Sequence, residues 1–329
     1  MLILSADEVR QALPMKEAIE AMKAAYAALS SGRAVVPLRT QLPIPGSEAL
    51  SLFMPAVVST AEQSALAVKV VSLFPTNPSR GLAFIQAAVL AFDPETGRAL
   101  ALLEGSSLTA IRTGAAGGAA IDLLARPESK VVAIFGAGAQ GRTQLEAACA
   151  VRQIKTAFLV DPNPEKAKAF VGELQGRNGI TQDIRVASSS REAIENADII
   201  CTATTSKNPV FGDRDLRPGT HISAVGSYTP EMQEVPAETL LRARIFVDSR
   251  SASLEEAGEL IQPIRLGLFD ESHICGELGE VVLGQISGRQ TPDEITYFKS
   301  VGIAVQDALA AQVALKNARA RNIGKEIDF

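Results

Sequence analysis

The spacing of apolar residues predicts an N-terminal helix followed by a region of strands. Between residues 7 and 31, apolar side chains recur at helical spacing at Val9, Leu13, Ile19, Met22, Tyr26 and Leu29. From about residue 35, prolines separate short apolar runs. These runs predict a mostly antiparallel sheet over Ser51–Pro55, Ala65–Phe74 and Phe84–Phe92. A hairpin turn at 93–97 and a helix rich in small residues at 106–125 complete this part of the chain.

From residue 130 the pattern changes to alternating strands and helices. The predicted strands are Val131–Phe135, Thr156–Asp161, Ile184–Val186, Asp198–Thr202, His221–Val225 and Ile245–Val247. The intervening helices are expected near 142–153, 163–176, 190–196 and 236–242. Such alternation is typical of an α/β fold with a doubly wound parallel sheet, which binds ligands at the carboxyl ends of its strands.

A last long helix is expected from near Pro292 to about Arg319. Since the N-terminal region has few helices of its own, we expect this tail to return to it. The predicted organisation is therefore a Rossmann domain at 127–304, inserted into an α+β domain formed by 1–126 and 305–329.

Composition narrows the class of protein. The length of 329 residues favours two domains. The net charge of −5 gives no electrostatic footprint for nucleic acid. No apolar run is long enough for a membrane span, and the N-terminus lacks signal-peptide features. The three cysteines, Cys149, Cys201 and Cys275, are widely spaced, which excludes a CxxC pair and favours a reducing cytoplasm.

The chain contains two histidines, His221 and His273. This scarcity excludes a His-rich metal site, and we expect no metal. Proton transfer would fall instead to Lys, Glu, Asp or Tyr.

The strand at Val131–Phe135 runs directly into Gly136-Ala137-Gly138-Ala139-Gln140-Gly141, a Gly-x-Gly-x-x-Gly sequence. In this pattern the first glycine permits a tight turn, the second lets the backbone approach a pyrophosphate, and the third lets the helix pack on the strand. The free N–H groups at the start of the helix then face the phosphates. With its flanking strand, helix and later acid, the motif predicts a dinucleotide site.

Asp161 ends the next predicted strand and is expected to accept hydrogen bonds from the adenosine ribose, which favours NAD(H). An N-cap role is its alternative, although Asn163 can fill that role, and the nearby Lys166 leaves NADP(H) open. We assign cofactor binding to Gly136, Gly138, Ala139, Gln140, Gly141 and Asp161, with Thr202 and Thr204 at a later strand end.

Two cations stand in apolar surroundings. Lys69 interrupts the run Ala65–Phe74, where it must lose its charge, find a counter-charge or line a polar cavity. Arg112 lies among small residues, which suits bidentate capture of a carboxylate. The alternatives are a solvent-facing Lys69 and a structural ion pair for Arg112. Arg39 is a weaker candidate on the same reasoning.

Three acids after the sixth predicted strand allow structural interpretations. Glu256 is either a catalytic acid or a charge on a helix face, and the sequence favours the helix-face role. Glu277 and Glu280 are expected at helix ends or domain contacts.

Over essentially its whole length the chain resembles the ornithine cyclodeaminase/mu-crystallin family. The segments that carry the resemblance are Val68–Val71, Asp93–Arg98, Leu108–Ala116, Gly136–Gly141, Glu256–Glu259 and Gly276–Glu280. The family includes ornithine cyclodeaminase, an archaeal type of alanine dehydrogenase, cyclic ketimine reductases and mu-crystallin. The resemblance implies a homodimer joined by strands of the N-terminal domains. It also implies that Lys69, Arg112 and Arg39 are substrate-carboxylate and catalytic positions, and that Thr113 neighbours the cofactor.

One position departs from the cyclodeaminase pattern. Tyr228 stands where those enzymes have an Asp that serves deamination and cyclisation. A phenol has a reference pKa about six units above that of an aspartic acid, so it donates a proton more readily than it accepts one. This substitution favours reduction of an imine over cyclodeamination.

The sequence therefore predicts NAD(P)H-dependent reduction of a small cyclic ketimine carboxylate of the pyrroline-2-carboxylate or piperideine-2-carboxylate type. Arg112, Arg39 and Lys69 would hold the carboxylate, and Lys69, Tyr228 or Glu256 would supply the proton. The alternatives are an ornithine cyclodeaminase, an alanine dehydrogenase, or a mu-crystallin-like protein that binds NAD(P)H and a ligand without turnover. The ring size of the substrate and the direction of flux stay open.

Overall fold

A computed structural model describes residues 1–60 and 64–328 of the chain. It divides into two compact units. The first unit contains Met1–Arg112 and the segment from Ile303 onward, and the second contains Thr113–Gly302.

The first unit is built on a sheet that is antiparallel apart from one pair. Its strands are β1 (Leu2–Leu4), β2 (Ala34–Val35), β3 (Thr40–Pro43), β4 (Leu50–Ser59), β5 (Ser64–Leu73), β6 (Ile85–Phe92), β7 (Ala99–Glu104) and β16 (Lys325–Glu326). They follow the order β16-β1-β7-β6-β5-β4-β2, with β3 also paired to β4 and only the β1–β7 pair parallel among the described strands. The helices are α1 (Ala6–Ala12), α2 (Met15–Ser30) and α11 (Ala304–Arg321), with a 3₁₀ turn at Pro78–Arg80.

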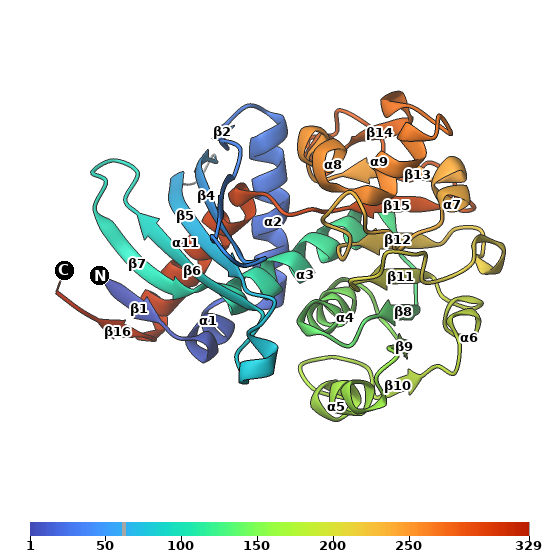
Figure 1. Cartoon of the computed structure of the whole chain (residues 1–329), viewed down its shortest axis with the longest axis horizontal. Coiled ribbons are helices and arrows are strands. Elements are labelled where there is room, and N and C mark those ends of the chain that lie inside the picture. Colours follow the sequence, from blue (N-terminus) through green and yellow to red (C-terminus); the bar gives the residue numbers. More distant parts are fainter. Residues whose placement is uncertain (61–63, 329) are drawn as a thin grey trace. The chain divides into compact units, whose positions relative to one another are not determined.

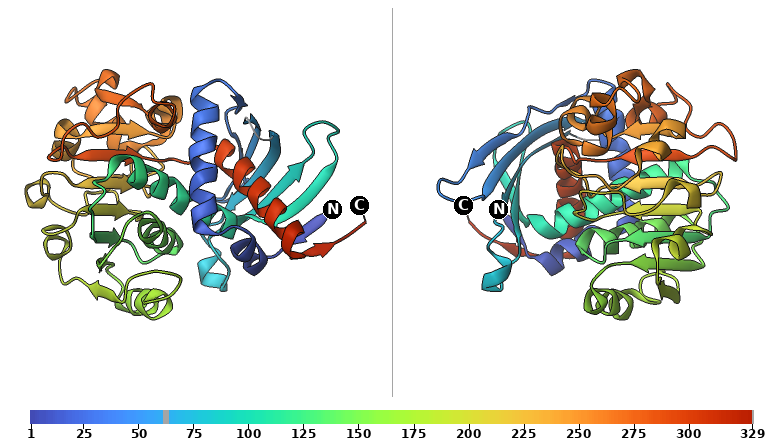
Figure 2. Two further views of the ribbon diagram at one scale, coloured as in Figure 1. Left: turned by 180° about the vertical axis from the view of Figure 1, so that it is seen from behind. Right: turned by 45° about the vertical axis from the view of Figure 1, so that its right-hand side comes forward.

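Helix α11 packs on one face of β4, β5 and β6, and α2 lies alongside it (Figure 2). Strand β5 alternates strictly between this covered face and the other: Ala65, Ala67, Lys69 and Val71 are buried, while the residues between them are partly exposed. Because side chains alternate along a strand, the period of two puts Lys69 on the helix-covered face.

The single helix expected over residues 7–31 is wrong. Two helices form, α1 and α2, with Leu13 and Pro14 between them. Proline has no N–H to donate and clashes with the preceding turn, so α1 ends before Pro14 and α2 begins after it.

The second unit is a doubly wound parallel sheet (Figure 1). Its strands are β8 (Val131–Phe135), β9 (Thr156–Val160), β10 (Asp183–Val186), β11 (Ile199–Thr202), β12 (His221–Ala224), β13 (Arg244–Val247), β14 (Ile274–Glu277) and β15 (Thr296–Lys299). They follow the order β10-β9-β8-β11-β12-β15-β13-β14, and every pair is parallel. The chain order reverses between β8 and β11, which is the position where this architecture binds ligands.

The helices of the second unit are α4 (Ala139–Val151), α5 (Pro164–Leu174), α6 (Ser190–Ile194), α7 (Ala237–Arg242), α8 (Arg250–Glu256), α9 (Gly258–Arg265) and α10 (Leu278–Val282). The predicted α/β class and its parallel sheet are confirmed. The prediction that the last helix begins near Pro292 is wrong, because residues 296–299 form β15 and α11 begins at Ala304. Strand β15 is buried between β12 and β13, and Thr296, Tyr297 and Phe298 are residue types that favour strands.

Helix α3 (Gly105–Leu124) spans the change from one unit to the other. The sequence-based boundary after residue 126 lies at its end, whereas the compact units divide within it, after Arg112. The glycines beyond this point explain the difference. A Cβ on Gly114 would lie 2.5 Å from Thr143 Cβ, and one on Gly117 would lie 2.1 Å from Gln144 Oε1. The small residues of α3 thus let its second half pack closely on α4.

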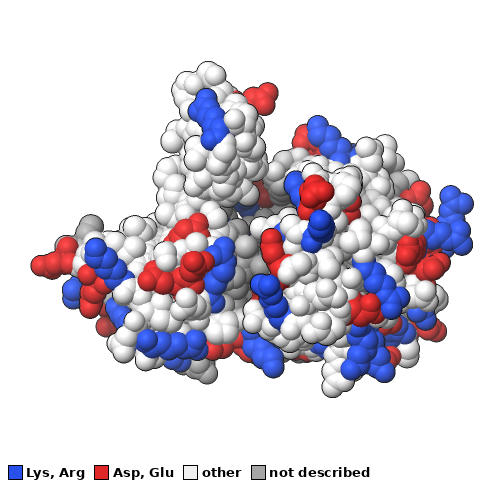
Figure 3. Space-filling model, turned by 90° about the horizontal axis from the view of Figure 1, so that it is seen from below, with Lys and Arg blue, Asp and Glu red and all other residues white. Residues whose placement is uncertain are grey.

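None of the helices within residues 1–60 and 64–328 is both long and apolar enough to cross a membrane. Cationic and anionic side chains are intermixed over the face of the molecule in Figure 3.

Candidate functional site

The two cations that stand out in the sequence contact the same carboxylate. Asp307, in the first turn of α11, lies 2.8 Å from Lys69 Nζ through Oδ2 and 3.0 Å from Arg112 Nε through Oδ1. The side chains of Lys69, Arg112 and Asp307 are 2%, 6% and 1% exposed. A solvent-facing Lys69 is therefore wrong, and the ion pair considered as the alternative for Arg112 is present.

A second contact holds the Arg112 guanidinium. Its Nη1 donates to Gln306 Oε1 at 2.8 Å, and the same oxygen accepts from the backbone N–H of Ile303 at 2.9 Å. The amide nitrogen of Gln306 donates to the Tyr26 hydroxyl at 2.6 Å. Arg112 is thus fixed in direction through Gln306, which is itself anchored to α2 and to the start of α11.

Burial and, to a smaller extent, the nearby charge of Arg112 together lower the pKa of Lys69 to about 8, against the raising effect of Asp307. Arg39, between β2 and β3, adds a smaller effect in the lowering direction, which places its charge close enough to be felt at Lys69. Lys69 can therefore gain or lose its proton near neutral pH.

The sequence interpretation missed Asp307 and Gln306, although the signal that marked Lys69 is present at both. Gln306 and Asp307 interrupt the apolar run Ile303–Ala310, and both are buried in α11. A charged residue inside an apolar helix needs a partner, so the reasoning that marked Lys69 also marks Asp307 as a candidate.

In the second unit, the loop between β8 and α4 has the geometry that the glycine motif predicts. Gly136 has φ +102°, and a Cβ there would lie 2.5 Å from the Ala203 carbonyl oxygen. A Cβ on Gly141 would lie 1.8 Å from the Gly136 carbonyl oxygen, while one on Gly138 would meet no atom within 4 Å. Two glycines therefore serve close packing, and Gly138 leaves open space above the backbone, as a pyrophosphate requires.

The remaining predicted cofactor residues of this region gather around the loop. Gly138 caps α4, so that Ala139 and Gln140 form its first turn, where backbone N–H groups have no helical acceptor. Asp161 follows β9 and accepts from the N–H of Ala137 at 2.7 Å and of Asn163 at 2.8 Å. Asn163 caps α5, so the N-cap alternative for Asp161 is not needed.

Thr113 is buried in α3, where its carbonyl accepts from Gln144 of α4. Thr202, also predicted to bind the cofactor, is fully buried, and its hydroxyl donates to Glu234 at 3.0 Å. The hydroxyl is therefore engaged within the protein. Thr204 is partly exposed, and its N–H donates to Glu234 at 2.6 Å.

Tyr228 and Glu256 are the predicted proton donors of the second unit. Tyr228 follows β12, is 39% exposed, and has its pKa raised by partial burial, so the phenol keeps its proton. Glu256 is the last residue of α8 and is partly buried. Of the other acids, Glu277 accepts from the N–H of Arg250, and Glu280 accepts from the N–H of Glu277, which are structural contacts.

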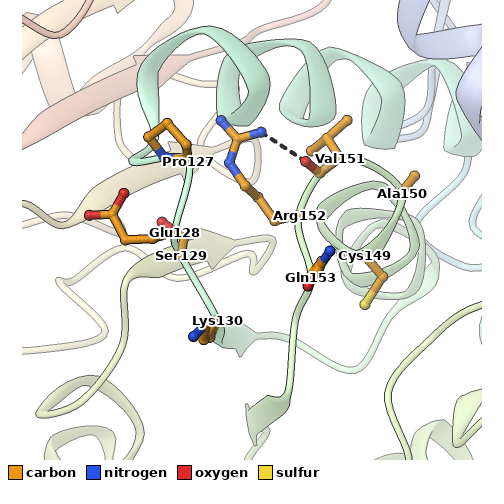
Figure 4. A pocket seen from close by; sticks show the side chains of 9 residues that line it. All are labelled: Pro127, Glu128, Ser129, Lys130, Cys149, Ala150, Val151, Arg152 and Gln153. Atoms are coloured by element: carbon orange, nitrogen blue, oxygen red, sulfur yellow. Dashed lines mark hydrogen bonds between the residues drawn. The ribbon is translucent and has the colours of Figure 1, made fainter.

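A pocket of about 390 Å³ lies elsewhere in the second unit (Figure 4). Residues 127–130, before β8, and 149–153, before β9, line it. It therefore lies at the amino ends of the strands, whereas the glycine loop lies at a carboxyl end. Within the described residues, no group of three or more His, Cys, Asp or Glu side chains could hold a metal ion.

Comparison with known proteins shows the family of the chain. The sequence profile of the ornithine cyclodeaminase/mu-crystallin family matches residues 1–322. The chain belongs to this family. The family resemblance expected from the sequence is thereby confirmed.

Among curated relatives, a Delta(1)-pyrroline-2-carboxylate reductase of Bacillus cereus is 42% identical, with 100% of both chains covered. Among solved structures, the Thermococcus litoralis Delta(1)-pyrroline-2-carboxylate reductase in complex with NADH and L-proline has a TM-score of 0.93 and 43% identity, covering 99% of this chain and 100% of that one. An archaeal alanine dehydrogenase dimer with bound NAD has a TM-score of 0.91 and 34% identity, covering 100% and 99%.

Proposed function

We propose that the protein reduces a small cyclic ketimine carboxylate, of the pyrroline-2-carboxylate or piperideine-2-carboxylate type, to the cyclic amino acid with NADH as reductant. The relatives that cover its whole length include reductases of this kind, and one of them binds NADH and L-proline. Both the glycine loop and the buried cations fit this chemistry.

The observation that carries the proposal is an excess of buried positive charge. Among the described residues, Asp307 is the one carboxylate that contacts either Lys69 or Arg112, and the charge of Arg39 also acts on Lys69. Unbalanced buried charge is costly, so the cluster favours an anionic ligand. The carboxylate of an imino acid supplies that charge, and an arginine binds it through two N–H groups.

Reduction converts C=N to CH–NH, with hydride added to carbon and a proton to nitrogen. When bound, a reduced nicotinamide supplies the hydride. Lys69, with a pKa lowered to about 8, is protonated at neutral pH and can donate the proton to the imine nitrogen. Tyr228 and Glu256 stay as alternative donors, and the raised pKa of Tyr228 makes its phenol the weaker acid.

For the cofactor, Gly136, Gly138 and Gly141 would form the turn at the pyrophosphate, and Ala139 and Gln140 would offer N–H groups of α4. The Asp161 carboxylate would accept from the ribose hydroxyls and repel a 2′-phosphate, which favours NADH over NADPH. Thr113 and Thr204 are further cofactor neighbours in this proposal.

A second enzyme activity is favoured by a specific observation, the likeness to the alanine dehydrogenase. That reaction also joins a hydride and a nitrogen to a carbon beside a carboxylate, but it consumes free ammonia. Ornithine cyclodeamination would release ammonia, and a protein that only binds NADH and a ligand would show no turnover.

We also propose a homodimer. The face of β4, β5 and β6 opposite α11 is apolar and partly exposed, at Phe53, Pro55, Val57, Leu66, Val68, Val70 and Leu90. A continuous apolar sheet face of this kind marks an interaction surface. The archaeal alanine dehydrogenase, described as a dimer, supports a second copy as its partner.

The carboxylate role of Arg112 is tested with two imines that differ in one group. Pyrroline-2-carboxylate and 1-pyrroline, which lacks the carboxylate, are compared by kcat/KM in the protein and in Arg112→Ala. Loss of a buried charge-assisted contact should lower kcat/KM for the carboxylate at least about 30-fold. The value for 1-pyrroline should change less than about threefold, because that ring has no carboxylate to bind. An equal fall for both imines would contradict the role, and Arg185→Ala, an exposed arginine of the second unit, is the control.

A further inference from the structure

One buried carboxylate, Glu234, gathers the two backbone segments that follow β11 and β12. Its Oε1 accepts from the N–H of Thr204 at 2.6 Å. Its Oε2 accepts from the N–H of Gly226 at 2.8 Å, the N–H of Ser227 at 3.2 Å and the hydroxyl of Thr202 at 3.0 Å. Glu234 is fully buried, so four donors, one from the last residue of β11 and three from the two loops, converge on a side chain that water does not reach.

These two loops stand at the ligand-binding edge of the second sheet. Strand β11 is the neighbour of β8 across the reversal of chain order, and β12 is the next strand along. Their carboxyl ends therefore lie beside the end of β8 that carries the glycine loop. In this architecture, a dinucleotide that places its pyrophosphate at the glycine loop extends its second half across these strand ends.

A second buried acid fixes Glu234 in place. Glu259 Oε1 accepts from the backbone N–H of Glu234 at 3.0 Å. Its Oε2 accepts from the Tyr297 hydroxyl at 2.5 Å and lies 3.3 Å from Lys299 Nζ. Since Tyr297 and Lys299 belong to β15, the support comes from the rigid sheet itself.

Burial raises the pKa of Glu234, and the Glu259 charge raises it further, against the opposing effects of Lys299 and the Thr204 N–H. Burial of an acid at this position costs free energy, which its four hydrogen-bond donors offset in part. Gly226 shows how closely the loop approaches, because a Cβ there would lie 2.5 Å from Glu234 Oε1. A buried acid with such donors, placed between two loops rather than within one, is suited to holding backbone in a fixed position.

We propose that Glu234 is a positioning residue, which fixes the loops at Thr204 and at Gly226–Ser227 so that they receive the nicotinamide half of the cofactor. The inference rests on the proposed function, since it assumes a dinucleotide at the glycine loop. It assigns Glu234 no contact with the reacting atoms. Glu234 acts indirectly, by fixing the backbone of the two loops and the position of Tyr228, which directly follows Ser227.

The test compares two ligands that share the adenosine and pyrophosphate groups. NADH contains the nicotinamide, whereas ADP-ribose lacks it, and both are titrated by calorimetry against the protein and Glu234→Gln. The glutamine amide presents N–H groups where the carboxylate accepted, so one of the two loops must move. The Kd for NADH should rise at least about tenfold, while the Kd for ADP-ribose stays within about twofold.

A general loss of structure would weaken both ligands together, which separates a positioning role from a merely structural one. Thr202→Val is a milder second variant, because it removes one donor to Glu234 and keeps the side-chain shape. It should raise the Kd for NADH about threefold to tenfold with ADP-ribose binding unchanged.

The inference is overturned if either folded variant binds NADH as tightly as the unaltered protein, or if the two ligands weaken equally. If the unaltered protein binds neither ligand, the proposed cofactor fails first, so the two failures are distinguishable. Asp161→Asn is the matched control, and it should weaken NADH and ADP-ribose together, because Asp161 serves the half that they share.

Discussion

At Lys69, burial and three charged neighbours set how much of the ammonium stays charged near neutral pH. Burial and the charges of Arg112 and Arg39 lower the pKa of Lys69, and Asp307 raises it. If protonated Lys69 is the proton donor, activity falls as the pH rises through its pKa of about 8. In Asp307→Asn the raising effect is lost, so the pKa drops further and activity should fall at a lower pH.

This shift is measured from the pH dependence of kcat/KM for the imine. Because Asp307→Asn removes an opposite charge that contacts Lys69, the fall of kcat/KM at alkaline pH should occur at least about one pH unit lower. Glu20→Gln, which changes an exposed acid of α2, should leave the pH of this fall unchanged. If kcat/KM falls at the same pH in Asp307→Asn and in the unaltered protein, another group donates the proton.

The residues of the cationic cluster were partly predictable. Lys69 and Arg112 stand out because each is a charge within an apolar run, and the structure buries both. Their pairing with Asp307 could not be predicted, because the two cations and the acid belong to β5, α3 and α11, and no local pattern says which of these elements meet. Thr202 lies at a strand end, as predicted, but its hydrogen bond to Glu234 could not be predicted from any local pattern in the sequence.

Among the elements, the loop between β8 and α4 allows a test that separates packing from ligand binding. Gly141→Ala places a Cβ 1.8 Å from the Gly136 carbonyl oxygen, so helix and strand must move apart. This variant should lose both thermal stability and NADH affinity. Gly138→Ala adds a Cβ that meets no atom within 4 Å, and it should keep its Tm within about 2 °C.

For Gly138→Ala, affinity for NADH should nevertheless fall at least about tenfold, because the added methyl group occupies the space expected for the pyrophosphate. Melting curves and fluorescence titration of NADH check both variants. Unchanged NADH binding in Gly138→Ala would contradict a pyrophosphate at this glycine.

Elements bounded by clear signals were predicted well, and those without were missed. Strands β8, β9, β11 and β12 are apolar runs of strand length between helical segments, and each lies close to its predicted place. Strand β15 lies where the sequence predicted the start of a helix, although Gly302, with a φ of +83°, separates the strand from α11. The break between α1 and α2 could have been predicted from Pro14.

At the scale of the whole molecule, the proposed dimer predicts a mass in solution of twice the 34.6 kDa chain mass. Val68→Glu places a charge on the apolar outer face of β5 and should shift the mass toward that of one chain. Gln153→Glu adds the same charge at an exposed position of the second unit and should leave the dimer intact. Light scattering after size exclusion measures all three, and a monomeric unaltered protein would contradict the dimer.

The measurement that tests the central claim most directly is oxidation of NADH and NADPH with three substrate sets, which are pyrroline-2-carboxylate, piperideine-2-carboxylate, and pyruvate with ammonia. Ammonia release from L-ornithine with NAD is measured in parallel, because cyclodeamination is redox-neutral overall and oxidises no NADH. The expected result is rapid oxidation of NADH with a cyclic imine and no added ammonia. Turnover only with pyruvate and ammonia, or ammonia release from ornithine, would contradict it and would mean that Tyr228 does not decide the reaction.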